Sequence, residues 1–143
     1  MNVFKNSSFS TDKDIKEKII MVAIDKIQVT KTDVEITREL RDLFISIGVN
    51  YRSRGFRYLI TACTEVVFNP KSINNGVTKV LYPSLAKEYD TTPGCIERCI
   101  RSSIENIDLD DNPKAIEIFG HIKKLSNSIF IAAIADYIRI NSL

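Results

Sequence analysis

Val77 to Glu105 carry the sequence VTKVLYPSLAKEYDTTPGCIERCIRSSIE, which predicts two short helices joined by a polar turn. Pro83 suits the first position of a helix ending near Tyr89, because a proline there gives up only an amide that has no helical partner. The DTT triplet then interrupts the pattern, with Thr92 as the N-cap of a second helix that starts at Pro93. Two helices joined by so short a turn predict a helix-turn-helix.

The second helix, expected from Pro93 to about Ile107, has an apolar side and a polar side. Its inner stripe at helical spacing consists of Ile96, Ile100, Ile104 and Ile107. Its outer side carries Glu97, Arg98, Arg101, Ser102 and Glu105. Arginine can donate two parallel hydrogen bonds to guanine and glutamate can accept one from cytosine, so the outer side suits base recognition in a major groove. A solvated helix face with i,i+4 ion pairs, such as Glu97 with Arg101, fits the same spacing equally well.

Longer stretches of the chain carry a family resemblance. KVLYPSLAKEYDTT followed by IERCIRSSIE resembles the C-terminal DNA-binding domain of the master sporulation response regulator of endospore-forming Firmicutes, where KVLYP, AKKY or AKKF, NTT and VERAIR occur. Upstream, LRDLFISIGVNYRSRGFRYLITAC is similar to the family's IGV, its KGY or RGY and its long second helix. Downstream, SNSIFIAAIADYIRI resembles the family ending NSEFIAMVADKLRL. The resemblance covers about Asp33 to Ile140.

The resemblance implies a fold and a set of DNA contacts. It implies an all-α domain of about six helices that binds a short asymmetric DNA box with a TGTCGAA-like core. Glu97, Arg98 and Arg101 match the family's base-reading positions, so it implies base contacts for these three. Contacts with the DNA backbone or flanking bases are expected for residues near the motif: Lys79, Lys87, Thr92 and Ser102.

The chain also departs from the family pattern. Gly94, Cys95 and Ser102 stand where the family commonly has serine, arginine and histidine. These differences remove a positive charge and a hydrogen-bonding group from the DNA face, so affinity or flanking-base preference is expected to differ. Family members carry an N-terminal phosphoacceptor receiver domain, which is far longer than the segment preceding Asp33. We therefore expect no receiver in this chain.

Residues 1–30 are expected to form an extension to the domain at 31–143. An amphipathic helix is predicted from about Thr11 to Val29, with apolar residues at helical spacing: Ile15, Ile19, Val22, Ala23 and Ile27. The simplest interpretation is an extra helix packed on the domain core. The functional alternative is a helix that mediates homo-dimerisation or binds a regulator partner in place of the receiver. A membrane-surface role fits less well, because acidic residues are mixed with lysines on the polar side.

The composition fits one compact domain but not a strongly basic one. The chain has 143 residues, 44% of them hydrophobic, and a net charge of +2, which is modest for a DNA-binding protein. Any basic surface must therefore be local. The arginines of YRSRGFRY, Arg52, Arg54 and Arg57, supply one cluster, either as a solvated helix entry or as a contact with the DNA backbone or a second protomer. Asp108, Asp110 and Asp111 make the loop after the second helix acidic.

The cysteines and the lone histidine limit other chemistry. Cys63, Cys95 and Cys99 form no CxxC pair, and their odd number without a signal peptide indicates reduced thiols in a cytoplasm. Cys95 and Cys99 share a helix face and could hold a metal with two further ligands, but His121 is the only histidine, so we predict no metal site. A redox role for Cys95 at a helix start has a better physical basis. Without a glycine-rich phosphate loop or a nucleophile motif, we predict no cofactor and no enzyme.

The remaining sequence predicts a helical scaffold. Helices are expected from Asp33 to Ile47, closed by Gly48, and from Phe56 to Phe68. Asn112 should cap a short helix through Phe119, and Asn127 should cap the last helix. The expected core residues of the first and last of these helices are Ile36, Leu40, Leu43, Phe44, Ile47, Phe130, Ile131, Ile134, Ala135 and Ile138.

The patterns and the resemblance together indicate a sequence-specific transcriptional regulator that binds double-stranded DNA. The alternative is a protein-interaction modulator that pairs with itself or with a full-length regulator and has little DNA binding of its own. The modest charge and the changed residues at 94, 95 and 102 favour this alternative. Glu97, Arg98 and Arg101, all present together, oppose it. RNA polymerase is a further candidate partner, and no membrane role is expected.

Overall fold

The structure is a computed structural model that describes residues 13–20, 31–74 and 76–142. The chain divides into two units, of which the second is Asp33–Ser142. In the first unit, residues 13–20 are helical, and the side chains of Ile15, Ile19 and Ile20 are exposed. The rest of the helix predicted from Thr11 to Val29 lies outside the described residues.

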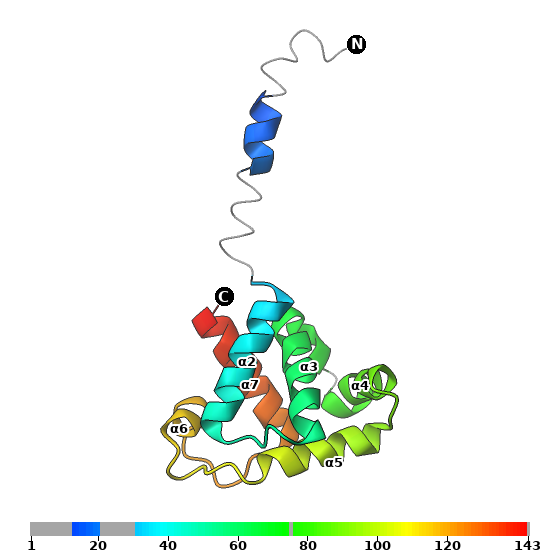
Figure 1. The fold of residues 1–143 in the computed structure, drawn as a ribbon, viewed down its shortest axis with the longest axis vertical. Coiled ribbons are helices and arrows are strands. Elements are labelled where there is room, and N and C mark those ends of the chain that lie inside the picture. The colour runs from blue at the N-terminus through cyan, green and yellow to red at the C-terminus, as the bar shows by residue number, and fades with distance from the viewer. Residues whose placement is uncertain (1–12, 21–30, 75, 143) are drawn as a thin grey trace. The chain divides into compact units, whose positions relative to one another are not determined.

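The second unit is built from helices alone within its described residues, which confirms the all-α prediction (Figure 1). Six α-helices follow one another, and two short helical turns lie between α3 and α4. In chain order the elements are α2 (Asp33–Ile47), α3 (Arg54–Phe68), η1 (Pro70–Ile73), η2 (Val77–Leu81), α4 (Tyr82–Glu88), α5 (Pro93–Ile104), α6 (Pro113–Phe119) and α7 (Asn127–Ser142). None of the helices in the described part of the chain has the length and apolar character that a membrane crossing requires.

Helix α3 lies at the centre of the core and contacts α2, α5 and α7. Aromatic rings link the elements around it: the Phe44 ring centroid lies 5.7 Å from that of Phe56 and 5.5 Å from that of Phe130. All ten core residues predicted for α2 and α7 are buried. Apolar residues at three- and four-residue spacing must be removed from water together, so the pattern located these faces correctly.

Two helix starts differ from the prediction because a serine provides the cap. Helix α3 begins at Arg54 rather than Phe56, since the Ser53 hydroxyl accepts a hydrogen bond from the Phe56 amide at 3.2 Å. Before α7, the Ser126 hydroxyl accepts from the Ile129 amide at 3.2 Å, so Ser126 rather than Asn127 caps this helix. The predicted cap of α6 is confirmed, because the Asn112 side chain accepts from the Ala115 amide.

The first helix of the helix-turn-helix does not begin at Pro83. Val77–Leu81 form a turn of π-helix that continues directly into α4, so Pro83 is the second residue of α4. The Tyr82 amide donates to the Val77 carbonyl. Pro83 has no amide with which to continue the usual i to i−4 pattern, and a wider turn accommodates such an interruption. The predicted start was therefore wrong by more than one helical turn.

Candidate nucleic-acid interface

The turn between α4 and α5 has a defined geometry. Asp90 adopts a positive φ of 53°, which makes it the one described non-glycine residue in this region of backbone space. The Thr91 amide turns back to the Ala86 carbonyl at 2.9 Å, and the Tyr89 amide donates to Leu85. This is the Schellman arrangement that closes a helix and reverses the chain. It directs the chain into α5 within a few residues, as the DTT triplet predicted.

Helix α5 starts where the sequence predicts but ends earlier. The Thr92 hydroxyl accepts from the Cys95 amide at 3.1 Å, and Pro93 is the first helical residue. The helix stops at Ile104 rather than Ile107, because the Asp108 carboxylate accepts from the amides of Asp110 and Asp111 and organises a turn. Ile107 is nevertheless buried in the loop, so the predicted apolar stripe is correct although its last member is not helical.

The contact between α3 and α5 depends on a small residue. Gly55 of α3 lies so close to α5 that an added Cβ would come within 2.0 Å of the Ser103 hydroxyl oxygen and 2.1 Å of the Cys99 carbonyl oxygen. The Ser103 hydroxyl is buried, donates to the Cys99 carbonyl at 2.8 Å and lies 2.6 Å from the Ser53 hydroxyl. The cap of α3 is thus tied to the inner side of α5. Sequence reasoning assigned Gly55 only to a helix end and missed this contact.

Asn127, the first residue of α7, fixes the other flank of α5. Its side-chain amide donates to the Glu97 carbonyl oxygen at 3.1 Å and to the Tyr82 hydroxyl at 3.0 Å. One amide group therefore joins α4, α5 and α7. The side chain predicted to cap its own helix instead holds the two helices of the helix-turn-helix together, and no local spacing could indicate this.

The three residues expected to contact bases lie together on the open side of α5. Glu97, Arg98 and Arg101 line one groove of about 440 Å³ between α5 and the start of α4. The groove is completed by Thr78, Tyr82, Pro93 and Gly94. Arg98 and Arg101 are exposed, whereas Glu97 is half-buried. The inner side of the same helix is fully packed, so these side chains point away from the core.

Glu97 and Arg101 form an ion pair along α5 in the absence of DNA. The hydrogen bond from Arg101 to the Glu97 carboxylate, together with its charge, raises the pKa of the Arg101 guanidinium. This is the i,i+4 pair that a solvated helix face would also form. Arg98 is exposed beside the pair. Two of the three candidate side chains are therefore held in place before any ligand arrives.

The residues expected near the DNA backbone lie around this groove rather than in it. Lys79 is exposed on η2 and Lys87 is exposed in the last turn of α4. Thr92 is exposed, but its hydroxyl oxygen already accepts the capping bond. Ser102 is exposed on the outer side of α5. Thr78 lines the groove itself, and the sequence did not single it out.

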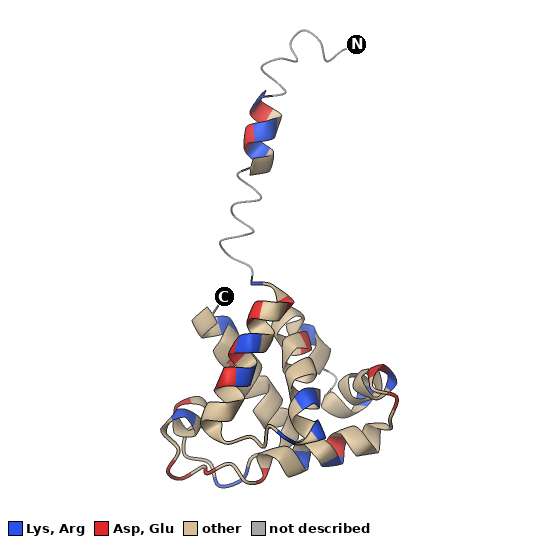
Figure 2. Ribbon diagram, in the orientation of Figure 1, with Lys and Arg blue, Asp and Glu red and all other residues tan. Residues whose placement is uncertain are grey.

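The predicted arginine cluster lies next to the helix-turn-helix. Arg54 is close enough to α5 for its charge to act on both Cys95 and Cys99. Arg41, Arg52 and Arg57 line an open groove of about 500 Å³ that reaches Tyr89 in the turn. Figure 2 shows basic positions at the end of α3 nearest α5. The arginines therefore extend the positive charge beyond α5.

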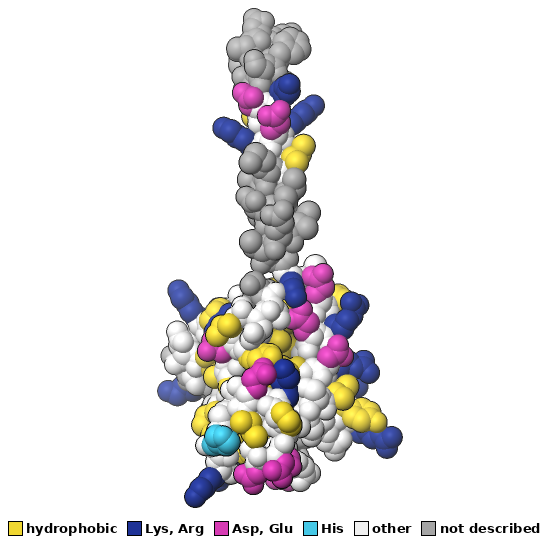
Figure 3. Space-filling model, turned by 90° about the vertical axis from the view of Figure 1, so that its left-hand side faces the viewer, with side chains coloured by type: hydrophobic (Ala, Val, Ile, Leu, Met, Phe, Trp, Pro, Cys, Tyr) yellow, Lys and Arg dark blue, Asp and Glu magenta, His cyan; other side chains and the backbone are white. Residues whose placement is uncertain are grey.

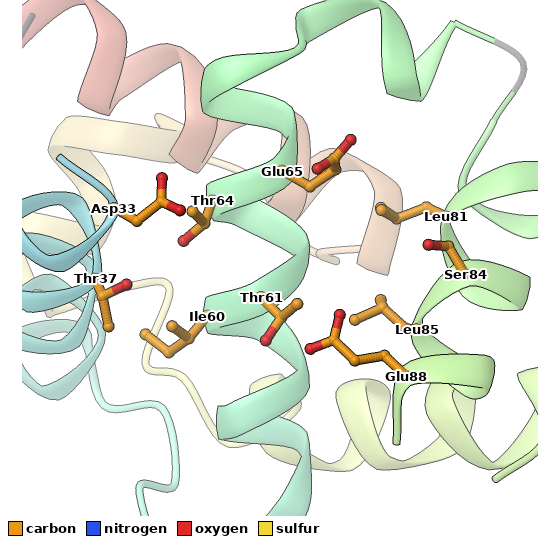
Figure 4. Close-up of a pocket in the computed structure, with 10 residues that line it drawn as sticks. All are labelled: Asp33, Thr37, Ile60, Thr61, Thr64, Glu65, Leu81, Ser84, Leu85 and Glu88. Carbon is orange, nitrogen blue, oxygen red and sulfur yellow. The ribbon is translucent and has the colours of Figure 1, made fainter. Parts of the chain in front are cut away.

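Acidic groups gather elsewhere on the domain. A groove of about 270 Å³ between α2, α3 and α4 is lined by three carboxylates, those of Asp33, Glu65 and Glu88, among threonine and aliphatic side chains (Figure 4). On the face viewed in Figure 3, acidic and basic side chains are interspersed with apolar ones. A low net charge thus conceals an uneven distribution, in which the α5 side carries the arginines.

Within the described residues, no group of three or more histidine, cysteine or acidic side chains converges in a way that could hold a metal ion. Cys95 and Cys99 do lie together, with their sulfurs 3.9 Å apart. His121 is exposed in the loop after α6. These positions offer two adjacent soft ligands and no third one.

The helix-turn-helix, the exposed outer side of α5 and the neighbouring arginines define a DNA-binding domain of the helical class. Residues 40–138 match the model of the family described as Sporulation initiation factor Spo0A C terminal. The match spans more than half of the chain, so the protein belongs to this family. The family is a DNA-binding effector domain of sporulation regulators and is not a family of enzymes. The protein is accordingly a DNA-binding transcription regulator of this type.

Proposed function

We propose that the protein recognises a short DNA box with a TGTCGAA-like core by inserting α5 into the major groove. Arg98 and Arg101 donate to guanines, and Glu97 accepts from a cytosine. The observation that carries this proposal is the grouping of these three side chains on the open side of a helix whose other side is buried. A major groove about 12 Å wide admits such a helix.

The ion pair between Glu97 and Arg101 supports a specific arrangement of the contacts. A carboxylate beside the guanidinium limits the directions in which Arg101 can extend, so less conformational freedom is lost when the side chain meets a base. Glu97 keeps a second carboxylate oxygen with which to accept from cytosine. Arg98 needs no rearrangement of this pair to reach a guanine.

Contacts with the DNA backbone would come from the rim of the same surface. Lys79, Lys87, Thr92 and Ser102 remain our candidates, and Arg54 joins them because it lies beside α5. Backbone contacts supply affinity without sequence information, and each one releases counterions. The residues at 94 and 95 add no charge here, so we expect flanking bases to contribute little.

A gel-shift titration tests the proposal. The full chain is titrated against a duplex carrying the TGTCGAA-like box and against a scrambled duplex of equal length and composition, at one fixed salt concentration. We expect tighter binding to the box by about a thousandfold or more, as is usual for specific over non-specific sites. Equal affinity for the two duplexes would rule out sequence recognition.

A second function is favoured by the helix at residues 13–20. Its exposed Ile15, Ile19 and Ile20 provide apolar surface that a second copy or another regulator could cover. In this view residues 11–29 mediate association, and the domain acts partly through protein contacts, including contacts with RNA polymerase.

Removing residues 1–30 separates the two functions, because Asp33–Ser142 form a compact unit without them. Sedimentation and the gel shift are measured on the full chain and on the shortened one. Lost oligomerisation with unchanged box binding assigns the segment to association. Unchanged sedimentation would refute that role.

A further inference from the structure

The two cysteines of α5 form a pair of neighbouring thiols at the edge of the proposed reading surface. The Cys95 and Cys99 sulfurs lie 3.9 Å apart, one helical turn from each other, and both side chains are partly exposed. Cys63, in contrast, is completely buried in α3. The chain thus contains one accessible thiol pair and one inaccessible thiol.

The surroundings of the pair give its members different reactivities. A hydrogen bond from the Thr91 side chain, a contact with Cys99 and the charges of Arg54 and Arg98 lower the pKa of the Cys95 thiol. Cys95 also lies in the first turn of α5, where the helix dipole favours a thiolate. Burial raises the pKa of Cys99, and burial also raises that of Cys63. Cys95 is therefore the nucleophile, and Cys99 is the adjacent protonated thiol.

We propose that Cys95 and Cys99 form a peroxide-sensitive dithiol whose oxidation to a disulfide weakens DNA binding by α5. The Cys95 thiolate attacks one oxygen of hydrogen peroxide, which forms a sulfenic acid and releases hydroxide. The Cys99 thiol then attacks the sulfenic sulfur, which forms the disulfide and releases water. The two thiols supply the two electrons that reduce the peroxide.

The disulfide would disturb the helix that carries the base contacts. Side chains one turn apart on a helix have Cβ atoms about 5–6 Å apart, whereas a disulfide holds them about 3.5–4.5 Å apart. Closing the bridge must therefore pull the first turn of α5 out of its regular shape. Arg98 lies between the two cysteines in sequence, so its guanidinium moves with that turn. This consequence rests on the proposed function, whereas the thiol chemistry does not.

A metal is a poorer occupant of the same pair. The described residues place no third histidine, cysteine or carboxylate with the two sulfurs. The positive charges of Arg54 and Arg98 repel a cation but favour a thiolate.

The thiol chemistry is tested on the full chain with hydrogen peroxide. After treatment, free thiols are alkylated under denaturing conditions and the protein is weighed by mass spectrometry. We expect the reduced chain to take three alkyl groups and the oxidised chain only one, at Cys63. In the Cys99→Ser variant, Cys95 should stop at a sulfenic acid that dimedone traps, and Cys95→Ser should react about tenfold more slowly. Oxidation of Cys95 no faster than that of free cysteine, or bridges formed only between chains, would overturn the proposal.

The effect on DNA is tested with the same preparations. Oxidised protein should bind the box about tenfold more weakly than reduced protein, and dithiothreitol should restore binding. The Cys95→Ser variant should bind equally before and after peroxide. Disulfide formation with unchanged affinity would overturn the link to DNA. Failure of both forms to bind the box would count against the proposed function, while the thiol measurements would still stand.

Discussion

The inner and outer sides of α5 are organised by opposite requirements. On the inner side, Ile96, Ile100 and Ser103 are buried, and Gly55 of α3 leaves no room for even one more carbon atom. On the outer side, Arg98 and Arg101 are exposed, and Gly94 has open space around it except for the Arg98 guanidinium 3.7 Å away. The inner side fixes the position of the helix, and the outer side keeps its side chains available. Substitutions on the two sides should therefore fail in different ways.

The largest effect is expected from Gly55→Ala. The new methyl group overlaps a backbone carbonyl of α5, which cannot move without separating α3 from α5. We expect a loss of about 3 kcal/mol in the free energy of unfolding, at the upper end for overpacking. Urea denaturation followed by circular dichroism measures it. Gly94→Ala is the matched control and should stabilise α5 by about 0.5–1 kcal/mol. Equal stabilities of the two variants would mean that the α3–α5 contact is looser than described.

Arg98→Ala tests the outer side. It removes one candidate base contact, so discrimination at a single base pair should fall by about 1–3 kcal/mol. Gel shifts on duplexes with each base substituted in turn identify that pair. The fold should be unaffected, because Arg98 is exposed. Weaker binding to all duplexes by the same factor would instead make Arg98 a backbone contact.

Thr92→Ala removes the capping bond to the Cys95 amide at the start of α5. We expect the free energy of unfolding to fall by about 1 kcal/mol. Thr92→Ser keeps the capping oxygen and serves as the control in the same thermal melts. A loss of equal size in both variants would show that the methyl group, rather than the oxygen, is what matters.

Arg54→Ala and Lys79→Ala address the rim of the surface. Each should weaken binding to box and scrambled duplexes alike, and the slope of log K against log salt should become shallower by about one unit. Arg38→Ala, an equal charge change on α2, should leave the slope unchanged. Slopes that follow net charge alone, identical for all three variants, would contradict the local placement of these contacts.

The smallest effect is expected from Asp90→Gly in the turn. Asp90 holds a positive φ of 53°, which glycine adopts without a Cβ penalty. Since glycine also gains freedom in the unfolded chain, we expect a net stabilisation of only about 0.5 kcal/mol. Asp90→Ala keeps the Cβ and should give no gain. A loss with glycine would show that the Asp90 carboxylate stabilises the turn.

Several features were predictable because they depend on neighbours along the chain. The buried face of α2, the caps at Thr92 and Asn112 and the pairing of Glu97 with Arg101 all follow from spacing of three or four residues. Cys95 and Cys99 meet for the same reason. Helix boundaries were less secure. The π-helical start at Val77 and the end of α5 at Ile104 depend on particular hydrogen bonds that periodicity does not encode.

The apolar periodicity, the caps and the quoted motifs were enough to determine the helical class, the helix-turn-helix and the outward position of Glu97, Arg98 and Arg101. They determine these features because helix formation and the sorting of a helix into faces are local. Only the tertiary structure decided that Gly55 admits α5, that Asn127 joins α5 to α4, and that Arg54 lies beside the reading helix. Those contacts join residues far apart in the chain, and their positions are set by how whole helices pack against one another.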